Sequence, residues 1–151
     1  MAPAHSIAAR FRQWLSASFN SKPHDPRHEL GRRGEDAAAR FLKKQGYKVL
    51  YRNFRAPRGG EVDLVCRDKS CNTLVFVEVK TRTSEAYGQA AEAVNIGKQR
   101  LITRGALAWL RLLDQPEILS RFDVVEVYFE GGKPRFNLIQ DAFPISDPYI
   151  S

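Results

Sequence analysis

Two charged residues interrupt the most apolar stretch of the sequence. Glu78 and Lys80 lie within Leu74–Thr81, a segment in which nearly all of the remaining residues are apolar. This composition is typical of a strand buried on both faces, and residues two apart project from the same face of a strand. Burying a carboxylate and an ammonium group there costs free energy unless the groups pair or bind a ligand. The pair is therefore the first candidate for chemistry.

A second acidic pair has the same spacing in the preceding apolar segment. Glu61 and Asp63 lie in Glu61–Arg67, which we expect to be the neighbouring strand of a hairpin. In that arrangement Asp63 approaches Glu78, and two adjacent carboxylates repel each other and favour a cation between them. Such oxygen ligands suit Mg²⁺ or Mn²⁺. A lysine beside them can orient a water or stabilise charge on a phosphate. The alternative is an ordinary Glu–Lys pair at a strand end with Asp63 in solvent; the presence of Asp63 favours the functional interpretation.

The pattern of apolar residues and turn signals predicts an α/β domain of order αβββαββ, with a central mixed β-sheet flanked by helices. The predicted elements are a helix over Glu29–Gln45, strands over Tyr47–Phe54, Glu61–Arg67 and Leu74–Thr81, a loop or short helical turn over Thr83–Ala93, a helix over Val94–Leu113, and strands over Phe122–Glu130 and Arg135–Ile139.

The first 28 residues differ in composition from the rest and form an expected N-terminal extension. They contain no acidic residue before Asp25, and Pro23 and Pro26 mark a linker. Trp14 and Phe19 belong to a helical repeat of apolar residues, so the segment is either a mobile tail or a short amphipathic helix. Residues 29–151 are expected to form the globular domain that carries these acids, with a short C-terminal tail from residue 141 onward.

The charge balance favours an anionic partner. The 151 residues include 24 basic and 17 acidic side chains, a net charge of +7, which favours nucleic acid first and a membrane surface second. No apolar run is long enough for a spanning helix, and the sequence starts without the pattern of a secretory signal. The two cysteines, Cys66 and Cys71, form no disulfide framework. We therefore expect a cytoplasmic protein without stable membrane insertion.

Several short sequence words, taken in order, resemble a known family. Residues 60–65 and 77–82 look like the D-Xn-(D/E)-x-K signature of the restriction-endonuclease-like PD-(D/E)xK superfamily. The further words resemble the YraN-like family, uncharacterised bacterial proteins related to archaeal Holliday-junction resolvases; they are Gly31–Ala38, Tyr51–Phe54, Glu92–Val94, Lys98, Arg100–Leu101 and Arg121–Val124. One departure is Val62, which stands where the superfamily name has proline.

The resemblance implies a role for each matching residue. Asp63 and Glu78 hold a Mg²⁺ or Mn²⁺ ion with the carbonyl of Val79, and Lys80 positions the attacking water. Glu35 matches an additional acidic residue that often reaches the metal through water; its alternative is a plain acid near a helix start. On the second helix, Lys98 or Gln99 takes a polar position near the phosphate, against the alternative of a solvated face.

Basic residues lie in or beside the segments that carry the acids. Each is singly an ordinary solvated residue, but as a group they predict a rim that neutralises phosphates. The group comprises Arg32, Arg33, Arg52, Arg55, Arg58 and Arg82.

The sequence therefore predicts a metal-dependent endonuclease that hydrolyses DNA phosphodiester bonds, directed by backbone or branched structure rather than by base sequence. One alternative is a nucleic-acid-binding module of the same fold without strong catalytic activity. Another is a docking or scaffold protein that binds a partner through the segment containing Trp14 and Phe19. Resolvase relatives work as dimers, so the resemblance leaves a homodimer open.

Overall fold

The computed structural model describes residues 25–82, 94–113 and 118–145. The predicted N-terminal amphipathic segment and the predicted loop over Thr83–Ala93 lie outside the described residues. The helices are α2 (Pro26–Lys44) and α3 (Ile96–Leu113), and the strands are β1 (Tyr47–Arg55), β2 (Glu61–Asp68), β3 (Thr73–Arg82), β4 (Ser120–Glu130) and β5 (Lys133–Ile139).

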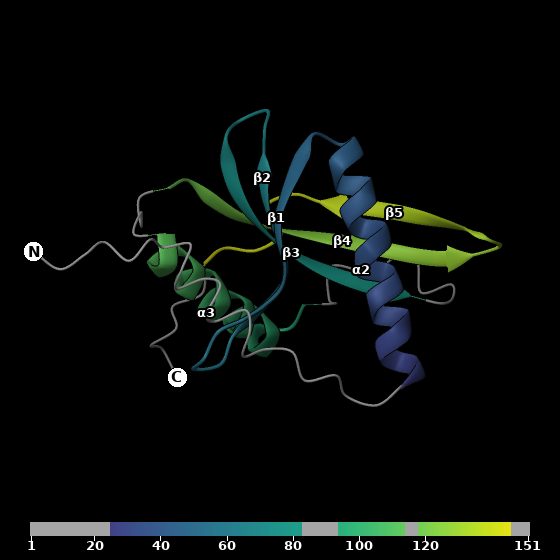
Figure 1. The fold of residues 1–151 in the computed structure, drawn as a ribbon, viewed down its shortest axis with the longest axis horizontal. Coiled ribbons are helices and arrows are strands. Elements are labelled where there is room, and N and C mark those ends of the chain that lie inside the picture. The colour runs from purple at the N-terminus through teal and green to yellow at the C-terminus, as the bar shows by residue number, and fades with distance from the viewer. Residues whose placement is uncertain (1–24, 83–93, 114–117, 146–151) are drawn as a thin grey trace, which may run out of the picture.

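The strands form one five-stranded sheet in the order β1-β2-β3-β4-β5 (Figure 1). Strands β3 and β4 are parallel and the other neighbours are antiparallel, so the sheet is mixed. A parallel pair needs a crossover connection, and α3 lies in the segment between β3 and β4. The predicted α/β class, the element order αβββαββ and the mixed sheet flanked by helices are confirmed.

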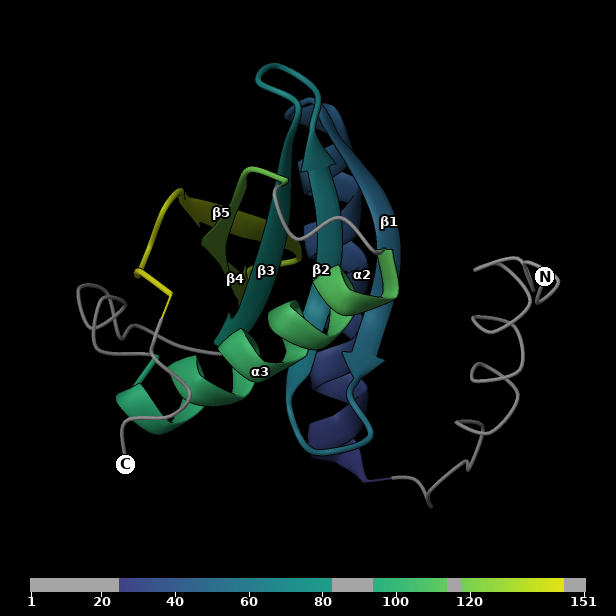
Figure 2. The ribbon, with the colours of Figure 1, turned by 90° about the vertical axis from the view of Figure 1, so that its left-hand side faces the viewer.

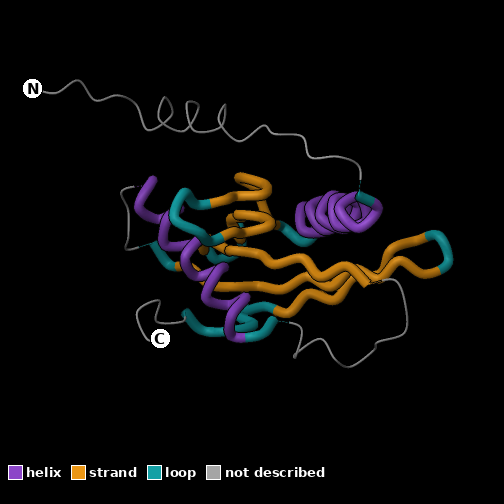
Figure 3. The backbone as a smooth tube through the Cα atoms, turned by 90° about the horizontal axis from the view of Figure 1, so that it is seen from below, coloured by secondary structure: helices purple, strands orange, loops and turns teal. Residues whose placement is uncertain are grey.

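The two helices cover opposite faces of the sheet, with α3 in front of the strands and α2 behind them in Figure 2. Each face has its own apolar core. On the α2 side Ala38 and Leu42 pack with Val75 and Val77. On the α3 side the buried residues include Phe54, Val62, Phe76, Ile102 and Trp109. Figure 3 shows α3 at one end of the sheet and the β4–β5 hairpin extending from the other.

Both helices have boundaries that differ from the prediction because of side-chain caps. Helix α2 begins three residues earlier than expected, since the Asp25 carboxylate accepts a hydrogen bond from the Arg27 backbone N–H at 2.9 Å and a proline occupies the first turn. Helix α3 begins at Ile96, two residues later than expected, because the Asn95 side chain accepts a hydrogen bond from the Lys98 N–H at 2.9 Å.

Among the described residues, no helix combines the length and apolarity that a membrane crossing requires.

In strands β1 and β2 the regular alternation of side chains between the two faces of the sheet is interrupted near Asn53 and Asp63. Arg52 reaches α2, whereas Phe54 packs in the core under α3, although residues two apart share a face in a regular strand. On β2, Leu64 belongs to the core under α2 and Val62 to the core under α3. Asn53 has a φ of 53°, in the left-handed region. The paired strands are therefore twisted at the level of Asp63.

Two glycines allow the helices to approach the sheet closely. A Cβ atom at Gly34 of α2 would lie 1.8 Å from Thr81 Oγ1 on β3. A Cβ atom at Gly105 of α3 would lie 3.0 Å from the Glu61 backbone nitrogen on β2. Both contacts lie beside candidate residues, because Glu35 follows Gly34 and Asp63 follows Glu61 by two positions.

Candidate functional site

Glu78 is the buried centre of the candidate site. Its Oε1 atom lies 3.5 Å from Lys80 Nζ on the same strand and 3.7 Å from Lys98 Nζ on α3. Glu78 and Lys80 thus share the α3 side of the sheet, as their spacing predicts. The Oε2 atom of Glu78 is buried and has no hydrogen-bond partner. A carboxylate oxygen left in this state is costly and is an acceptor available to a ligand.

Asp63 lies where the pairing of β2 and β3 ends. The last paired residues of β2 and β3 are Leu64 and Val77, so the two strands no longer pair at Asp63. There the Asp63 Oδ2 atom accepts a hydrogen bond from the Val79 backbone N–H at 2.9 Å. Asp63 lies near Glu78, and the carboxylates of Glu61, Asp63 and Glu78 all raise the pKa of Lys98 on α3.

The proximity of Asp63 and Glu78 appears in the electrostatics of Glu78. Burial raises the pKa of Glu78 well above its ordinary range, and the negative charge of Asp63 raises it further. Lys98 and Lys80 oppose these effects without cancelling them. The folded protein therefore favours either a proton or another positive charge at Glu78.

Glu35 on α2 approaches Asp63 from the other side of the sheet. Burial raises the pKa of Glu35 to about 7, and the negative charge of Asp63 adds to this effect. A hydrogen bond with the Asn53 side chain acts in the opposite direction. Glu35 is held there because Gly34 lets α2 pack closely on Thr81. Asp63 on β2 is thus the acid that lies close both to Glu35 on α2 and to Glu78 on β3.

Lys98 links α3 to two of the acidic residues. It forms an ion pair with Glu61, and its Nζ atom also lies within 3.7 Å of Glu78. The hydrogen bond from Lys98 holds the pKa of Glu61 below its ordinary range. Gln99 points elsewhere, since its side-chain amide donates to the Val94 carbonyl at 2.8 Å. The sequence did not single out Glu61 as a site residue, although its spacing from Asp63 was a usable signal.

The donors of the site suit a hard divalent cation. Asp63 and Glu78 supply carboxylate oxygens. The buried Glu78 Oε2 atom has no hydrogen-bond partner, and a cation bound there would satisfy it. Within residues 25–82, 94–113 and 118–145, however, no group of three or more His, Cys, Asp or Glu side chains is arranged for a metal. The fit therefore rests on two carboxylates, with Glu35 farther from a shared position.

The predicted basic rim divides into paired and unpaired residues. Arg52 is ion-paired with Asp36 at 2.6 Å, and the guanidinium of Arg33 lies 5.0 Å from the ring centroid of Phe129. Arg82 is partly buried, and its Nε atom has no hydrogen-bond partner. The exposed residues Arg32, Arg55 and Arg58 remain available to a ligand.

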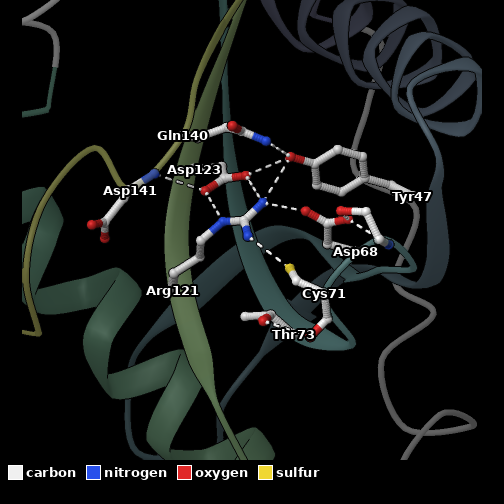
Figure 4. A network of polar contacts seen from close by, with 9 residues as sticks. Tyr47, Asp68, Cys71, Thr73, Arg121, Asp123, Gln140 and Asp141 are labelled. Atoms are coloured by element: carbon white, nitrogen blue, oxygen red, sulfur yellow. Dashed lines mark hydrogen bonds and ion pairs between the residues drawn. The ribbon is translucent and has the colours of Figure 1, made fainter.

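A separate polar network on the α2 side consists of residues that form hydrogen bonds and ion pairs with one another (Figure 4). Asp123 is buried and accepts hydrogen bonds from Tyr47 Oη at 3.0 Å, Arg121 Nε at 2.9 Å and the Asp141 backbone N–H at 3.0 Å. Arg121 also donates to Asp68 at 2.8 Å. This network ties β1, β2 and β4 together, which indicates a structural role.

Comparison with known proteins gives consistent family matches. The model of the uncharacterised protein family UPF0102 matches residues 34–127. A UPF0102 protein of Geobacter metallireducens is 47% identical over 117 residues, covering 78% of this chain and 93% of that protein. A UPF0102 protein of Caldicellulosiruptor saccharolyticus is 44% identical over 119 residues, covering 78% of this chain and 98% of that protein.

Among solved structures, the SfsA protein of Pyrococcus furiosus in complex with Ca²⁺ aligns with 75% of this chain and 62% of its own chain. Its sequence identity to this chain is 14% and the TM-score is 0.27.

Proposed function

The chain belongs to the uncharacterised protein family UPF0102, and from that premise we propose that it is a divalent-metal-dependent endonuclease that hydrolyses DNA phosphodiester bonds. One observation carries the proposal: the buried Glu78 Oε2 atom has no partner, although Glu78 lies beside a second carboxylate, Asp63. Proteins rarely leave such an atom unsatisfied without a ligand or a functional reason.

In this proposal Asp63, Glu78 and the Val79 carbonyl would hold Mg²⁺ or Mn²⁺, and Glu35 would add a further acidic group on the α2 side of Asp63. The bound ion supplies charge neutralisation and lowers the pKa of a coordinated water. Lys80, 3.5 Å from Glu78 Oε1, orients the attacking water and stabilises negative charge that develops on the phosphate. Lys98 holds Glu61 and Glu78 in place from α3.

The substrate assignment is supported by charge. The net charge of +7 favours a polyanion, and exposed Arg32, Arg55 and Arg58 are available for phosphates. No base-reading motif accompanies them, so recognition of the backbone or of a branched structure fits better than recognition of base sequence.

The test is a cleavage panel of single-stranded, duplex, flap and four-way-junction DNA with Mg²⁺ or Mn²⁺. We expect cleavage of at least one substrate, and we expect Lys80→Ala to abolish it while retaining Mn²⁺ binding in titration calorimetry. Asp63→Ala and Glu78→Ala should lose both properties, because carboxylates are the ligands that the ion needs.

Arg111→Ala is the matched control, since it removes a charge from the exposed end of α3. Cleavage at the wild-type rate by Asp63→Ala would place the site elsewhere. Wild-type protein that binds DNA and cuts none of the substrates would favour the non-catalytic binding module.

A further inference from the structure

The turn between β1 and β2 is fixed against the middle of α3. A Cβ atom at Gly60 would lie 2.6 Å from the Gly105 backbone nitrogen and 2.8 Å from Arg104 Cβ. In the other direction, a Cβ atom at Gly105 would lie 2.9 Å from Val62 Cγ2. The backbone of the turn and the backbone of the helix therefore meet with no room for a side chain between them.

This contact brings three exposed arginines from distant parts of the sequence to one place. Arg58 lies in the turn two residues before Gly60, and Arg55 pairs with Glu61 in the β1–β2 register at the base of the turn. Arg104 precedes Gly105 on α3, so it projects from the helix directly beside the turn. We name Arg55, Arg58 and Arg104 the turn–helix arginine cluster.

The charges of the turn–helix arginine cluster are uncompensated. Within the described part of the chain, none of the three guanidinium groups makes a hydrogen bond or an ion pair, in contrast to Arg52, which pairs with Asp36. Glu61 is affected by the charge of Arg55 but is already bound by Lys98. Like charges held together repel one another, so an anion that neutralises several of them is favoured.

We propose that the turn–helix arginine cluster binds successive phosphates of a DNA backbone and so guides the strand to the acidic site. The proposal rests on the function proposed above and deepens it by assigning a surface to the substrate. Glu61 connects the two features, since it pairs with Arg55 in register and lies two residues before Asp63. Arginine suits phosphate because its fork of donors binds two oxygens at once.

The rigidity of the contact explains why this surface fits an extended polyanion. The direct backbone contact fixes the end of the turn at Gly60 against Arg104 and Gly105, so that less of the surface has to be ordered on binding. Two of the cluster residues, Arg55 and Arg58, lie on the strand and turn that lead into β2, whereas Arg104 approaches from α3. A nucleic-acid strand passing between them contacts residues from both elements.

The experiment is fluorescence anisotropy with a short labelled DNA duplex in EDTA over a series of salt concentrations. We expect Arg58→Ala and Arg104→Ala each to weaken binding about tenfold and to reduce the slope of log K against log salt by about 1. Arg111→Ala is the matched control, because it removes the same charge from an exposed position on the same helix. It should leave the affinity within about twofold of wild type.

Folding of each variant is checked by thermal melting, and Arg104→Lys supplies a second variant that keeps the charge and removes the bidentate fork. Arg104→Lys should bind with intermediate affinity. Equal loss in Arg111→Ala and Arg104→Ala would overturn the cluster in favour of general charge attraction. The nucleic-acid assignment would be overturned if an acidic peptide bound the turn–helix arginine cluster more tightly than DNA does. Such a peptide would displace the DNA only from proteins in which the cluster is intact.

The outcomes separate this inference from the proposed nuclease activity. Cluster-dependent binding without cleavage of any substrate would support the DNA surface and refute the nuclease. Metal-dependent cleavage with binding that is unaffected in Arg58→Ala and Arg104→Ala would support the nuclease and refute the cluster. Wild-type protein that fails to bind DNA at low salt would refute both.

Discussion

Asp63 takes the place of a strand partner for Val79: its Oδ2 atom accepts a hydrogen bond from the Val79 backbone N–H at 2.9 Å, one residue beyond Leu64 on β2 and two beyond Val77 on β3, the last β2–β3 pair. A side chain thus occupies the position where the ladder between the strands would continue. The carboxylate is fixed by the backbone of the strand that carries Glu78. The distance between the two acids is therefore determined by the sheet and not by a flexible side chain.

This relationship predicts different effects for two substitutions of Asp63. Asp63→Asn removes the charge that repels Glu78 and keeps an oxygen for the Val79 N–H, whereas Asp63→Ala leaves that buried N–H without a partner. We expect metal-free Asp63→Asn to be more stable than Asp63→Ala by about 1 to 3 kcal/mol. Urea unfolding in EDTA measures the difference. Equal free energies of unfolding would show that the Val79 hydrogen bond has no energetic role.

The metal-free protein should lose stability as the pH rises. The pKa of Glu35 is raised from 4.5 to about 7 and the pKa of Glu78 is also raised, both chiefly by burial. A carboxyl whose pKa is higher in the folded state contributes stability below its unfolded pKa, and the contribution disappears as pH passes the folded pKa. Melting temperatures in EDTA should therefore fall between about pH 5 and pH 8.

Mn²⁺ should counteract this loss, because it competes with protons for the same oxygens. Its stabilising effect should be larger at pH 8 than at pH 6. The double variant Glu35→Gln/Glu78→Gln should show a flatter pH dependence in EDTA and little response to Mn²⁺. A melting temperature that increases through this pH range in EDTA would contradict the electrostatic account.

Two glycines of α2 should respond oppositely to alanine. Gly31 has no atom within 4 Å of an added Cβ, so Gly31→Ala should stabilise the helix by about 0.5 to 1 kcal/mol. At Gly34 the added Cβ would lie 1.8 Å from Thr81 Oγ1, so Gly34→Ala should destabilise by about 1 to 3 kcal/mol. Denaturant unfolding compares them. Adding Thr81→Ala to Gly34→Ala should recover part of the loss, and an absence of recovery would argue against this contact as the cause.

Asp123 should be among the most sensitive positions for stability. It is buried and accepts hydrogen bonds from Tyr47, Arg121 and Asp141, so Asp123→Ala leaves the charge of Arg121 and several donors without their partner. We expect a loss of about 3 to 5 kcal/mol, and about 1 kcal/mol for Tyr47→Phe. As a control, Arg52→Ala breaks the exposed ion pair with Asp36 and should change stability by less than about 1 kcal/mol. Similar losses in Asp123→Ala and Arg52→Ala would disprove the structural role of the network.

The sequence predicted the sheet and the central acid–lysine pair because both depend on local patterns. Glu78 and Lys80 share a face by simple strand geometry, and their burial follows from the apolar residues around them. Asp63 lies near Glu78, as the spacing of the acids in the two strands suggested. The hydrogen bond that holds Asp63, from the Val79 backbone N–H, depends on where the pairing of β2 and β3 ends, which no pattern within β2 records.

The arginines show a second limit of sequence reasoning. Arg33 and Arg52 were expected on the phosphate-binding rim, yet the structure places them against Phe129 and Asp36, partners that long-range packing selects. Arg104 was not singled out, because its proximity to the β1–β2 turn depends on contact between Gly60 and Gly105. Alternating polar and apolar residues show which face is exposed, but they do not show which exposed residues meet.

The arrangement of the strands also has a consequence for the order of folding. The Asp63–Val79 contact joins residues 16 positions apart within neighbouring antiparallel strands, whereas the Tyr47–Asp123 contact joins residues 76 positions apart. Closing a short loop costs less entropy and is faster than closing a long one, and parallel β3–β4 pairing must await the crossover through α3. We therefore expect the acidic pair to form in an early β1–β2–β3 meander, before the rest of the sheet is complete. Cations present during refolding would then act on the protein before its native core has closed.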